Sequence, residues 1–162
     1  MRAPETRGAD APVRASRNPR PMFHRVISAK PDLVRDTLAA IRGRFQHDIG
    51  ADAMGRLELV LAEVMNNVAK HGIGKGGRTV PLIHICIVSH DCGLACALTD
   101  DGDRLPPECL LPRSLPQLPD NELPEGGFGW YLIQDLTQEL CYYREDTRNF
   151  LAFRIPLMPA AS

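Results

Sequence analysis

LELVLAEVMNNVAKHG, residues 57–72, is the stretch of sequence that decides the fold, because its pattern predicts a long amphipathic helix. Its apolar residues recur in steps of three and four along one side. Together with Met54, which precedes the quoted stretch, they are Leu57, Leu61, Val64 and Val68. Gly72, in the glycine-rich run HGIGKGG, ends the helix. The helix therefore buries one stripe and leaves its other sides to polar residues.

Two polar residues of this helix, Glu63 and Asn67, are four positions apart and so lie one above the other on its surface. They fall at the border of the apolar stripe, where side chains can point into a cleft. There an asparagine oxygen can bind Mg²⁺ and a glutamate can accept a proton. The spacing alone favours a solvated helix flank, so other motifs must decide between the two interpretations.

The elements on either side of this helix predict a sheet with helices packed on it. Residues 22–29 are predicted to form an edge strand, and residues 32–45 a helix with apolar positions at Leu33, Leu38, Ile41 and Phe45. The remaining elements are a strand pair at 79–89 and 94–99, a helix that begins within 126–129 and runs to about 138, and a closing hairpin at 139–144 and 150–156. This order predicts an α/β fold, a two-layer sandwich whose mixed, mostly antiparallel sheet is covered on one face by helices.

Length and hydropathy fit one cytoplasmic domain. The chain has 162 residues, of which 44% are apolar. No apolar run reaches the ~18 to 20 residues of a spanning helix, and the first residues lack the apolar core of a signal peptide. We therefore expect a cytoplasmic protein that does not associate with a membrane.

Charge is divided unevenly between a tail and the domain. Residues 1–21 hold five arginines, two carboxylates and four prolines, which predicts a disordered basic tail before a domain at residues 22–162. The formal net charge of the whole chain is −1, so the domain itself is acidic. No direct binding of nucleic acid by the domain is expected.

Two further motifs follow the predicted strand pair. LTDDG, residues 98–102, places Asp100 at a strand end, where a carboxylate either caps a turn or accepts a hydrogen bond from an exocyclic amine such as that of adenine. GGFGWYLIQDL, residues 126–136, is a glycine-rich helix start, where free N–H groups and the helix dipole favour phosphate. Between them residues 103–125 contain six prolines, which exclude regular structure and predict a long loop.

Taken in order, EVMNNVAKHG, LTDDG and GGFGWYLIQDL resemble the nucleotide site of the GHKL superfamily, whose histidine-kinase-like ATPase domain is also called the Bergerat fold. Within that superfamily the motifs are most similar to those of the anti-sigma-factor serine/threonine kinases of partner-switching pathways. The resemblance covers about residues 25–157. It implies ATP and magnesium as ligands and residues 103–125 as an ATP lid.

The resemblance also implies roles for individual residues. Glu63 would be the catalytic general base, Asn67 would hold Mg²⁺, and Asp100 would accept the adenine amine. The ATP-binding residues that it implies are Asn67, His71, Asp100, Gly102, Gly126, Gly127, Phe128 and Gly129. Arg104 stands where the wider superfamily often has a second glycine after the Asp-x-Gly motif.

The function implied by the resemblance is an ATP-dependent protein serine/threonine kinase. Its partners would be a STAS-domain antagonist that it phosphorylates and a sigma factor or other regulator that it binds, and it would be a homodimer. The alternative is a catalytically silent ATP-binding switch protein that sequesters a partner. A zinc-stabilised interaction domain is a third interpretation, because five potential ligands lie close together in the sequence: His84, Cys86, His90, Cys92 and Cys96. In a hairpin, however, Cys96 would face away from the others.

Overall fold

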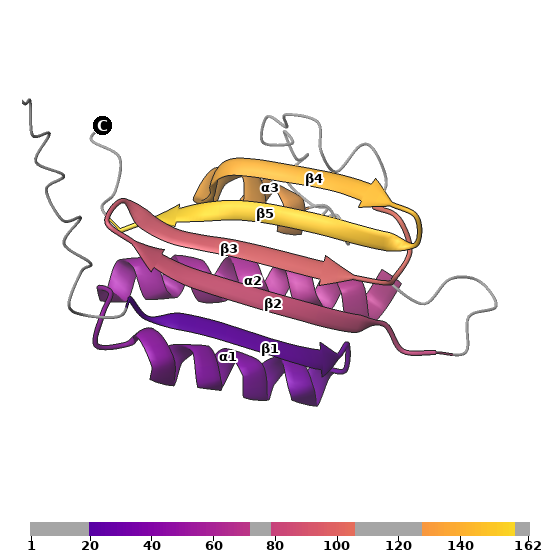
Figure 1. The fold of residues 1–162 in the computed structure, drawn as a ribbon, viewed down its shortest axis with the longest axis horizontal. Coiled ribbons are helices and arrows are strands. Elements are labelled where there is room, and N and C mark those ends of the chain that lie inside the picture. The colour runs from indigo at the N-terminus through magenta and orange to yellow at the C-terminus, as the bar shows by residue number, and fades with distance from the viewer. Residues whose placement is uncertain (1–19, 72–78, 106–127, 158–162) are drawn as a thin grey trace, which may run out of the picture.

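Five strands and three helices make up the part of the chain that the computed structural model describes, residues 20–71, 79–105 and 128–157 (Figure 1). In chain order they are β1 (Met22–Ser28), α1 (Pro31–Phe45), α2 (Ala51–His71), β2 (Leu82–His90), β3 (Gly93–Asp100), α3 (Phe128–Leu136), β4 (Gln138–Glu145) and β5 (Arg148–Pro156). None of these described helices is long and apolar enough to cross a bilayer. The predicted tail and lid lie almost wholly outside the described residues.

The strands form one sheet in the order β1-β2-β3-β5-β4, and the helices lie together on one face of it (Figure 1). This arrangement confirms the predicted two-layer α/β sandwich. Every neighbouring pair of described strands is antiparallel, so the sheet is more regular than the mixed sheet that the sequence predicts. β3 and β4 run in the same direction, but β5 lies between them, so no two parallel strands among those described are neighbours.

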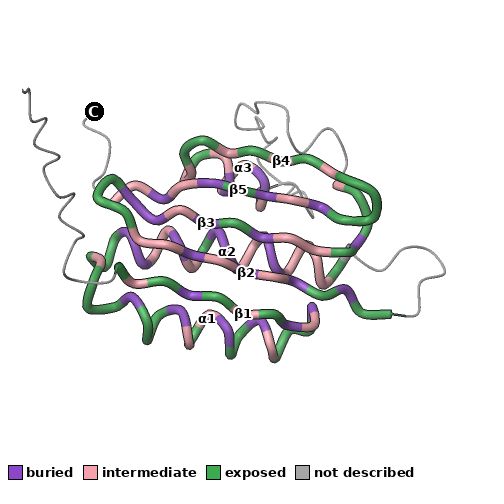
Figure 2. The backbone as a smooth tube through the Cα atoms, in the orientation of Figure 1, coloured by how far each residue is buried: buried purple, intermediate pink, exposed green. Residues whose placement is uncertain are grey.

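The core fills the space between the sheet and the helices, and buried positions alternate along the central strands (Figure 2). β2 turns Ile83, Ile85 and Ile87 inward because successive side chains of a strand point to opposite faces. The buried residues that α2 adds to this core are Ala53, Met54, Leu57, Val60, Leu61, Val64 and Met65. The predicted stripe of α2 is thus confirmed and widened, and only Val68 at its end is partly buried.

α1 has a buried stripe that differs from the predicted one. Its buried side chains are Val34, Thr37, Ile41 and Phe45, whereas Leu33 and Leu38 are only partly buried. The observed stripe also steps by three and four residues, so it fits helical geometry as well as the predicted one. Thr37 is polar and lies in the middle of this stripe, so the pattern of apolar residues alone does not indicate it.

Two element boundaries differ from the sequence prediction. β2 begins at Leu82 and not at residue 79, because Pro81 has no N–H for a strand ladder. The Pro81 carbonyl instead accepts a hydrogen bond from Ala29 N at 2.8 Å. α3 ends at Leu136 and not near residue 138, because Gln138 already pairs with β5 as the first residue of β4.

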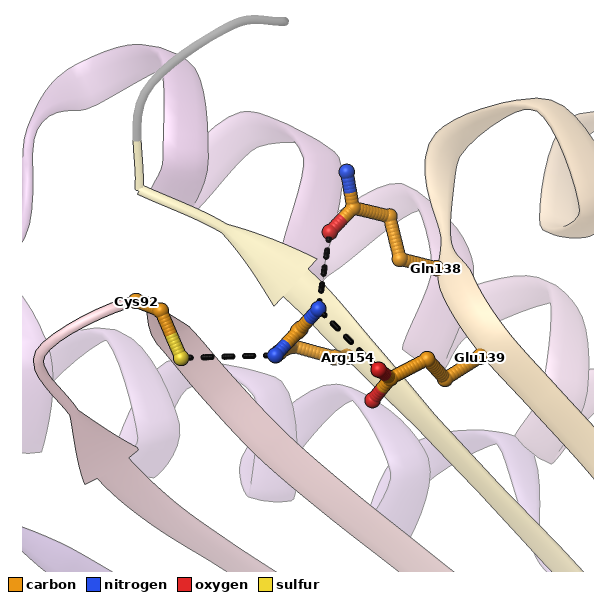
Figure 3. Close-up of polar contacts among 4 residues, drawn as sticks. All are labelled: Cys92, Gln138, Glu139 and Arg154. Carbon is orange, nitrogen blue, oxygen red and sulfur yellow. Dashed lines mark hydrogen bonds and ion pairs between the residues drawn. The ribbon is translucent and has the colours of Figure 1, made fainter.

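Hydrogen bonds from Arg154 link the start of β4 to the turn between β2 and β3 (Figure 3). Arg154 Nη2 donates to Glu139 Oε1 at 3.2 Å and to Gln138 Oε1 at 3.4 Å, and Nη1 donates to Cys92 Sγ at 3.3 Å. The pairing of β4 with β5 is irregular between Gln138 and Cys141, and Glu139 adopts a φ of 55°. The guanidinium therefore holds the irregular start of β4 against the sheet.

The face of the sheet opposite the helices carries several exposed apolar side chains: Met22, Val26, Leu82 and Tyr143. The histidines and cysteines considered as zinc ligands are divided between the two faces. Cys96 is buried in the core, whereas Cys86 is partly buried and Cys92 is exposed. Within the described ranges no three histidine, cysteine, aspartate or glutamate residues are grouped so as to hold a metal ion.

Candidate functional site

A pocket of about 560 Å³, including the part open to solvent, lies between α2, α3 and the end of the sheet where β3 finishes. The pocket is lined by Val64, Asn67 and Val68 of α2, Ile83 of β2, Leu98 and Asp100 of β3, Asp103, Arg104 and Leu105 beyond β3, Trp130 of α3, Tyr142 of β4, and Asn149 and Leu151 of β5.

The pocket combines an apolar floor with polar groups at its edges. Buried side chains from both layers form the floor: Val64, Ile83, Leu98, Trp130 and Leu151. The amide of Asn67 lies on the helix side and the carboxylate of Asp100 at the strand end. A flat apolar ring that carries a polar substituent matches this combination.

Asp100 supplies a hydrogen-bond acceptor at the end of β3. Its Oδ1 accepts hydrogen bonds from Gly102 N and from Asn149 Nδ2, both at 2.9 Å. Its Oδ2 has no hydrogen-bond partner among the described residues, so this oxygen is available to a ligand in the pocket. Burial raises the pKa of the Asp100 carboxyl, and the two hydrogen bonds to its charged form oppose that rise.

Glu63 and Asn67 lie where α2 meets the first turn of α3. A methyl group added at Gly129 would overlap Oε2 of Glu63 and lie 3.9 Å from Nδ2 of Asn67, so a side chain at residue 129 would require the Glu63 carboxylate to shift. The first turn of a helix has N–H groups without intrahelical partners and the positive end of the dipole. The neighbouring Asn66 does not line the pocket.

The structure brings part of the predicted site together. Asn67 and Asp100 line the same pocket, and Gly102 holds the Asp100 carboxylate through its N–H. Gly129 lies beside the Glu63 carboxylate, but neither residue is among those that line this pocket. Four predicted residues cannot be placed in this way: Gly126 and Gly127 lie outside the described residues, and the side chains of His71 and Phe128 are not described either.

Sequence reasoning missed Asn149, Tyr142 and Arg144, which surround Asp100. Asn149 is only 3% exposed, although asparagine is usually a surface residue. Its carbonyl oxygen accepts hydrogen bonds from Tyr142 Oη at 2.7 Å and from Arg144 Nη1 at 2.9 Å. The only sequence signal is that a polar residue stands at an inward position of β5, which becomes visible once the strand register is known.

The donor groups at the contact between α2 and α3 fit a magnesium ion. Asn67 offers an amide oxygen, and oxygen is the ligand atom that Mg²⁺ prefers. The missing side chain at Gly129 leaves the space in which these groups lie.

The fold and the pocket define a class of protein. Residues 27–155 match the model of the histidine kinase-like ATPase domain, and the chain belongs to this family. The resemblance to the GHKL superfamily that the three sequence motifs indicate is thereby confirmed.

Similar proteins narrow the class further. The chain is 29% identical over 119 residues to the serine-protein kinase RsbW of Staphylococcus epidermidis, an alignment that covers 70% of this chain and 71% of the kinase. The same kinase from two strains of that species matches equally well. Among solved structures, the RsbU and RsbW domains of Rv1364c from Mycobacterium tuberculosis superpose with a TM-score of 0.56 over 85% of this chain. The chain spans 32% of that protein at 12% identity, so this likeness concerns the fold alone.

Proposed function

We propose that the protein is a cytoplasmic, ATP-dependent protein serine/threonine kinase whose nucleotide site is the pocket between α2, α3 and the sheet. The observation that carries the proposal is that Asn67 of α2 and Asp100 of β3 line the same pocket. The similarity to serine-protein kinase RsbW supports the type of activity.

ATP would lie with its adenine on the apolar floor and its phosphates toward the first turn of α3. The carboxylate of Asp100 accepts the exocyclic amine through Oδ2, and the floor residues bury the faces of the ring. Asn67 and the N–H groups near Gly129 then face the phosphates. A magnesium ion held by Asn67 would neutralise charge on the phosphates during transfer.

Glu63 is the general base in this proposal. Its carboxylate accepts the proton of a serine or threonine hydroxyl while the hydroxyl oxygen bonds to the γ-phosphorus. The bond from the γ-phosphorus to the oxygen that bridges to the β-phosphate breaks, and ADP leaves with that oxygen. The position of Glu63 beside Gly129 supports this role, because the proposal directs the phosphates toward the first turn of α3.

The proposed protein partners follow from the family resemblance. They are a STAS-domain antagonist, which carries the phosphorylated hydroxyl, and a sigma factor or other regulator, which competes with it. A homodimer is the proposed assembly.

The test is incubation with labelled ATP, Mg²⁺ and the STAS-domain antagonist encoded beside the gene. Glu63→Gln should lower phosphoryl transfer by ~10² to 10⁴ while nucleotide and partner binding stay nearly intact, because glutamine keeps the size but cannot accept the proton. Glu58→Gln is the matched control, since Glu58 lies on the same helix but pairs with Arg42 at 2.6 Å. Transfer at the wild-type rate by Glu63→Gln would contradict the proposed mechanism.

The silent switch remains the second candidate function, and the same assay separates it from the kinase. Asn67→Ala should lose magnesium-dependent nucleotide affinity as well as activity, because it removes a metal ligand and not a base. If the unmutated protein binds ATP and its partner yet transfers no phosphate, the switch is the correct description.

A further inference from the structure

Asn149 is a buried amide that holds the end of β3. It lies opposite Asp100 in the register of β3 and β5 and is 3% exposed. Its Nδ2 donates to Asp100 Oδ1 at 2.9 Å, to Asp103 O at 3.0 Å and to Gly102 O at 3.2 Å. Both amide hydrogens are therefore used by acceptors on the segment that runs from Asp100 along the pocket wall.

The amide oxygen of Asn149 is held as firmly by two donors on β4. Tyr142 Oη donates at 2.7 Å and itself accepts from Leu105 N at 3.1 Å. Arg144 Nη1 donates at 2.9 Å and also to Gly102 O at 3.0 Å. Since only donors meet the oxygen and only acceptors meet the nitrogen, the amide has one orientation.

We propose that Asn149, oriented by Tyr142 and Arg144, is the positioning residue that makes the pocket selective for adenine. These three side chains form the Asn149 cluster. Because Asn149 donates to Oδ1 of Asp100, Oδ2 is left as the oxygen that meets the purine. The inference rests on the proposed nucleotide-binding function and adds the groups that set its specificity.

The selectivity follows from the groups at position 6 of the two purines. Adenine presents an amine donor there, which a fixed carboxylate oxygen accepts, whereas guanine presents a carbonyl oxygen, which the same carboxylate repels. Sites built around one buried hydrogen bond reject the mismatched ligand strongly because a polar group is left unpaired. A carboxylate that can turn, or a 102–105 segment that can shift, admits water and weakens that rejection.

Tyr142→Phe tests the cluster with a minimal change, because it removes one hydroxyl and keeps the ring in the pocket wall. Affinity for Mg-ADP should fall about tenfold, and the ratio of Mg-ADP to Mg-GDP affinity should fall with it. Tyr143→Phe is the matched control. That tyrosine is 52% exposed on the other face of the sheet and stacks on Phe150, so both affinities should stay within about twofold of wild type.

Asn149→Asp tests the donor itself, because the new side chain has the same shape but no amide hydrogens. At neutral pH two carboxylates would face each other at the present hydrogen-bond distance of 2.9 Å, and Mg-ADP binding should be lost. As the pH falls, the new carboxyl takes up a proton, donates to Asp100 and restores binding. The other charged groups near this pair are Asp101, Asp103, Arg104 and Arg144.

Calorimetric titration of the full chain with Mg-ADP and Mg-GDP measures both affinities and tests the inference. Selective binding by wild type, reduced selectivity in Tyr142→Phe and acid-restored binding in Asn149→Asp support the inference. Selective wild-type binding with an unchanged affinity ratio in both variants overturns the inference alone, and an equal loss for both nucleotides is one such case. Equal affinity of wild type for Mg-ADP and Mg-GDP also overturns the inference while leaving nucleotide binding in place. If wild type binds neither nucleotide, the proposed function fails and this inference fails with it.

Discussion

At the scale of single residues, Asp100 is a carboxylate whose two oxygens have different surroundings. Oδ1 is held by Gly102 and Asn149, and Oδ2 has no partner among the residues described. One oxygen therefore fixes the side chain, and the other is the oxygen that meets the ligand in the proposed site. This division is what a pocket needs if it is to read one functional group of a base.

Asp100→Asn should change which purine the pocket prefers. The asparagine oxygen can still accept from Gly102 and Asn149, so its amide nitrogen takes the position that faces the pocket. A donor there opposes the adenine amine and suits a carbonyl. Affinity for ADP should fall by ~1 to 3 kcal/mol while affinity for inosine diphosphate rises relative to it. Titration calorimetry with both nucleotides measures this. Asp101→Asn is the control, because Asp101 instead accepts from Leu82 N.

The pH dependence of nucleotide binding should show the raised pKa of Asp100. Burial is its first cause, the negative charge of Asp101 adds to it, and the hydrogen bonds and Arg144 oppose it. Asp103 and Arg104 also line the pocket. Because the ionised carboxylate accepts the amine, binding should weaken as the pH falls, beginning above the ordinary aspartate pKa of ~3.9. Titrations across a pH series test this, and an acid limb at the ordinary value would contradict it.

The raised pKa of Asp100 has the opposite effect on the stability of the unliganded protein: its contribution to folding increases as the pH falls. A carboxyl with a higher pKa in the folded state favours folding at pH values below its unfolded pKa, and that contribution is lost as the pH rises through the folded value. Asp100→Asn should therefore leave the thermal midpoint at pH 7 equal to or above that of wild type. A large decrease would mean that the carboxylate stabilises the fold.

Gly129→Ala should separate phosphoryl transfer from nucleotide binding. The added methyl group must displace the Glu63 carboxylate, and a misplaced catalytic group costs ~10² in rate. Transfer to the antagonist should fall by about that factor, with a much smaller change in Mg-ADP affinity. Gly43→Ala in α1 is the control, because nothing lies within 4 Å of the added methyl group. It should stabilise the protein by ~0.5 to 1 kcal/mol and leave transfer unchanged.

At the scale of secondary structure elements, α2 joins the core to the pocket. Its buried side holds Leu61 and Met65 against the sheet, while its flank brings Asn67 to the pocket and Glu63 beside Gly129. Burial of the stripe therefore fixes the direction in which the two polar side chains point. The same helix supports the stability of the domain and the geometry of its site.

Leu61→Ala should lower the free energy of unfolding by ~2 to 5 kcal/mol, because the residue is fully buried and its loss leaves a cavity. Leu59→Ala on the same helix is the control. Leu59 is 52% exposed, so its removal should change stability by less than ~0.5 kcal/mol. Urea unfolding measures both variants. Equal effects of the two substitutions would show that the buried stripe is not where the structure places it.

The elements also show what the sequence could predict and why the rest was missed. The stripe of α2 was predictable because helix periodicity is a local property of the chain. The start of β2 was predicted at residue 79 and lies at residue 82, since the effect of Pro81 depends on where the strand ladder begins. The Asn149 cluster depends on the register of β3 with β5, which joins residues far apart in sequence and leaves no local pattern.

At the scale of the whole molecule, the sheet order explains why the site forms where it does. Because β5 is placed between β3 and β4, residues that follow β3 meet side chains of both later strands. The three predicted motifs come from α2, the end of β3 and the start of α3, and each contributes a residue to the pocket lining: Asn67, Asp100 and Trp130. Their roles in catalysis and binding stay predictions until nucleotide binding is measured.

The central claim is that this pocket binds an adenine nucleotide, and calorimetry of the full chain with Mg-ADP tests it most directly. We expect saturable heat with one site per chain, a rise in the thermal midpoint, and little heat with Mg-GDP. Binding to a site raises apparent stability in proportion to the logarithm of ligand concentration over Kd, so the two measurements check each other. Neither heat nor a thermal shift at millimolar Mg-ADP would contradict the account.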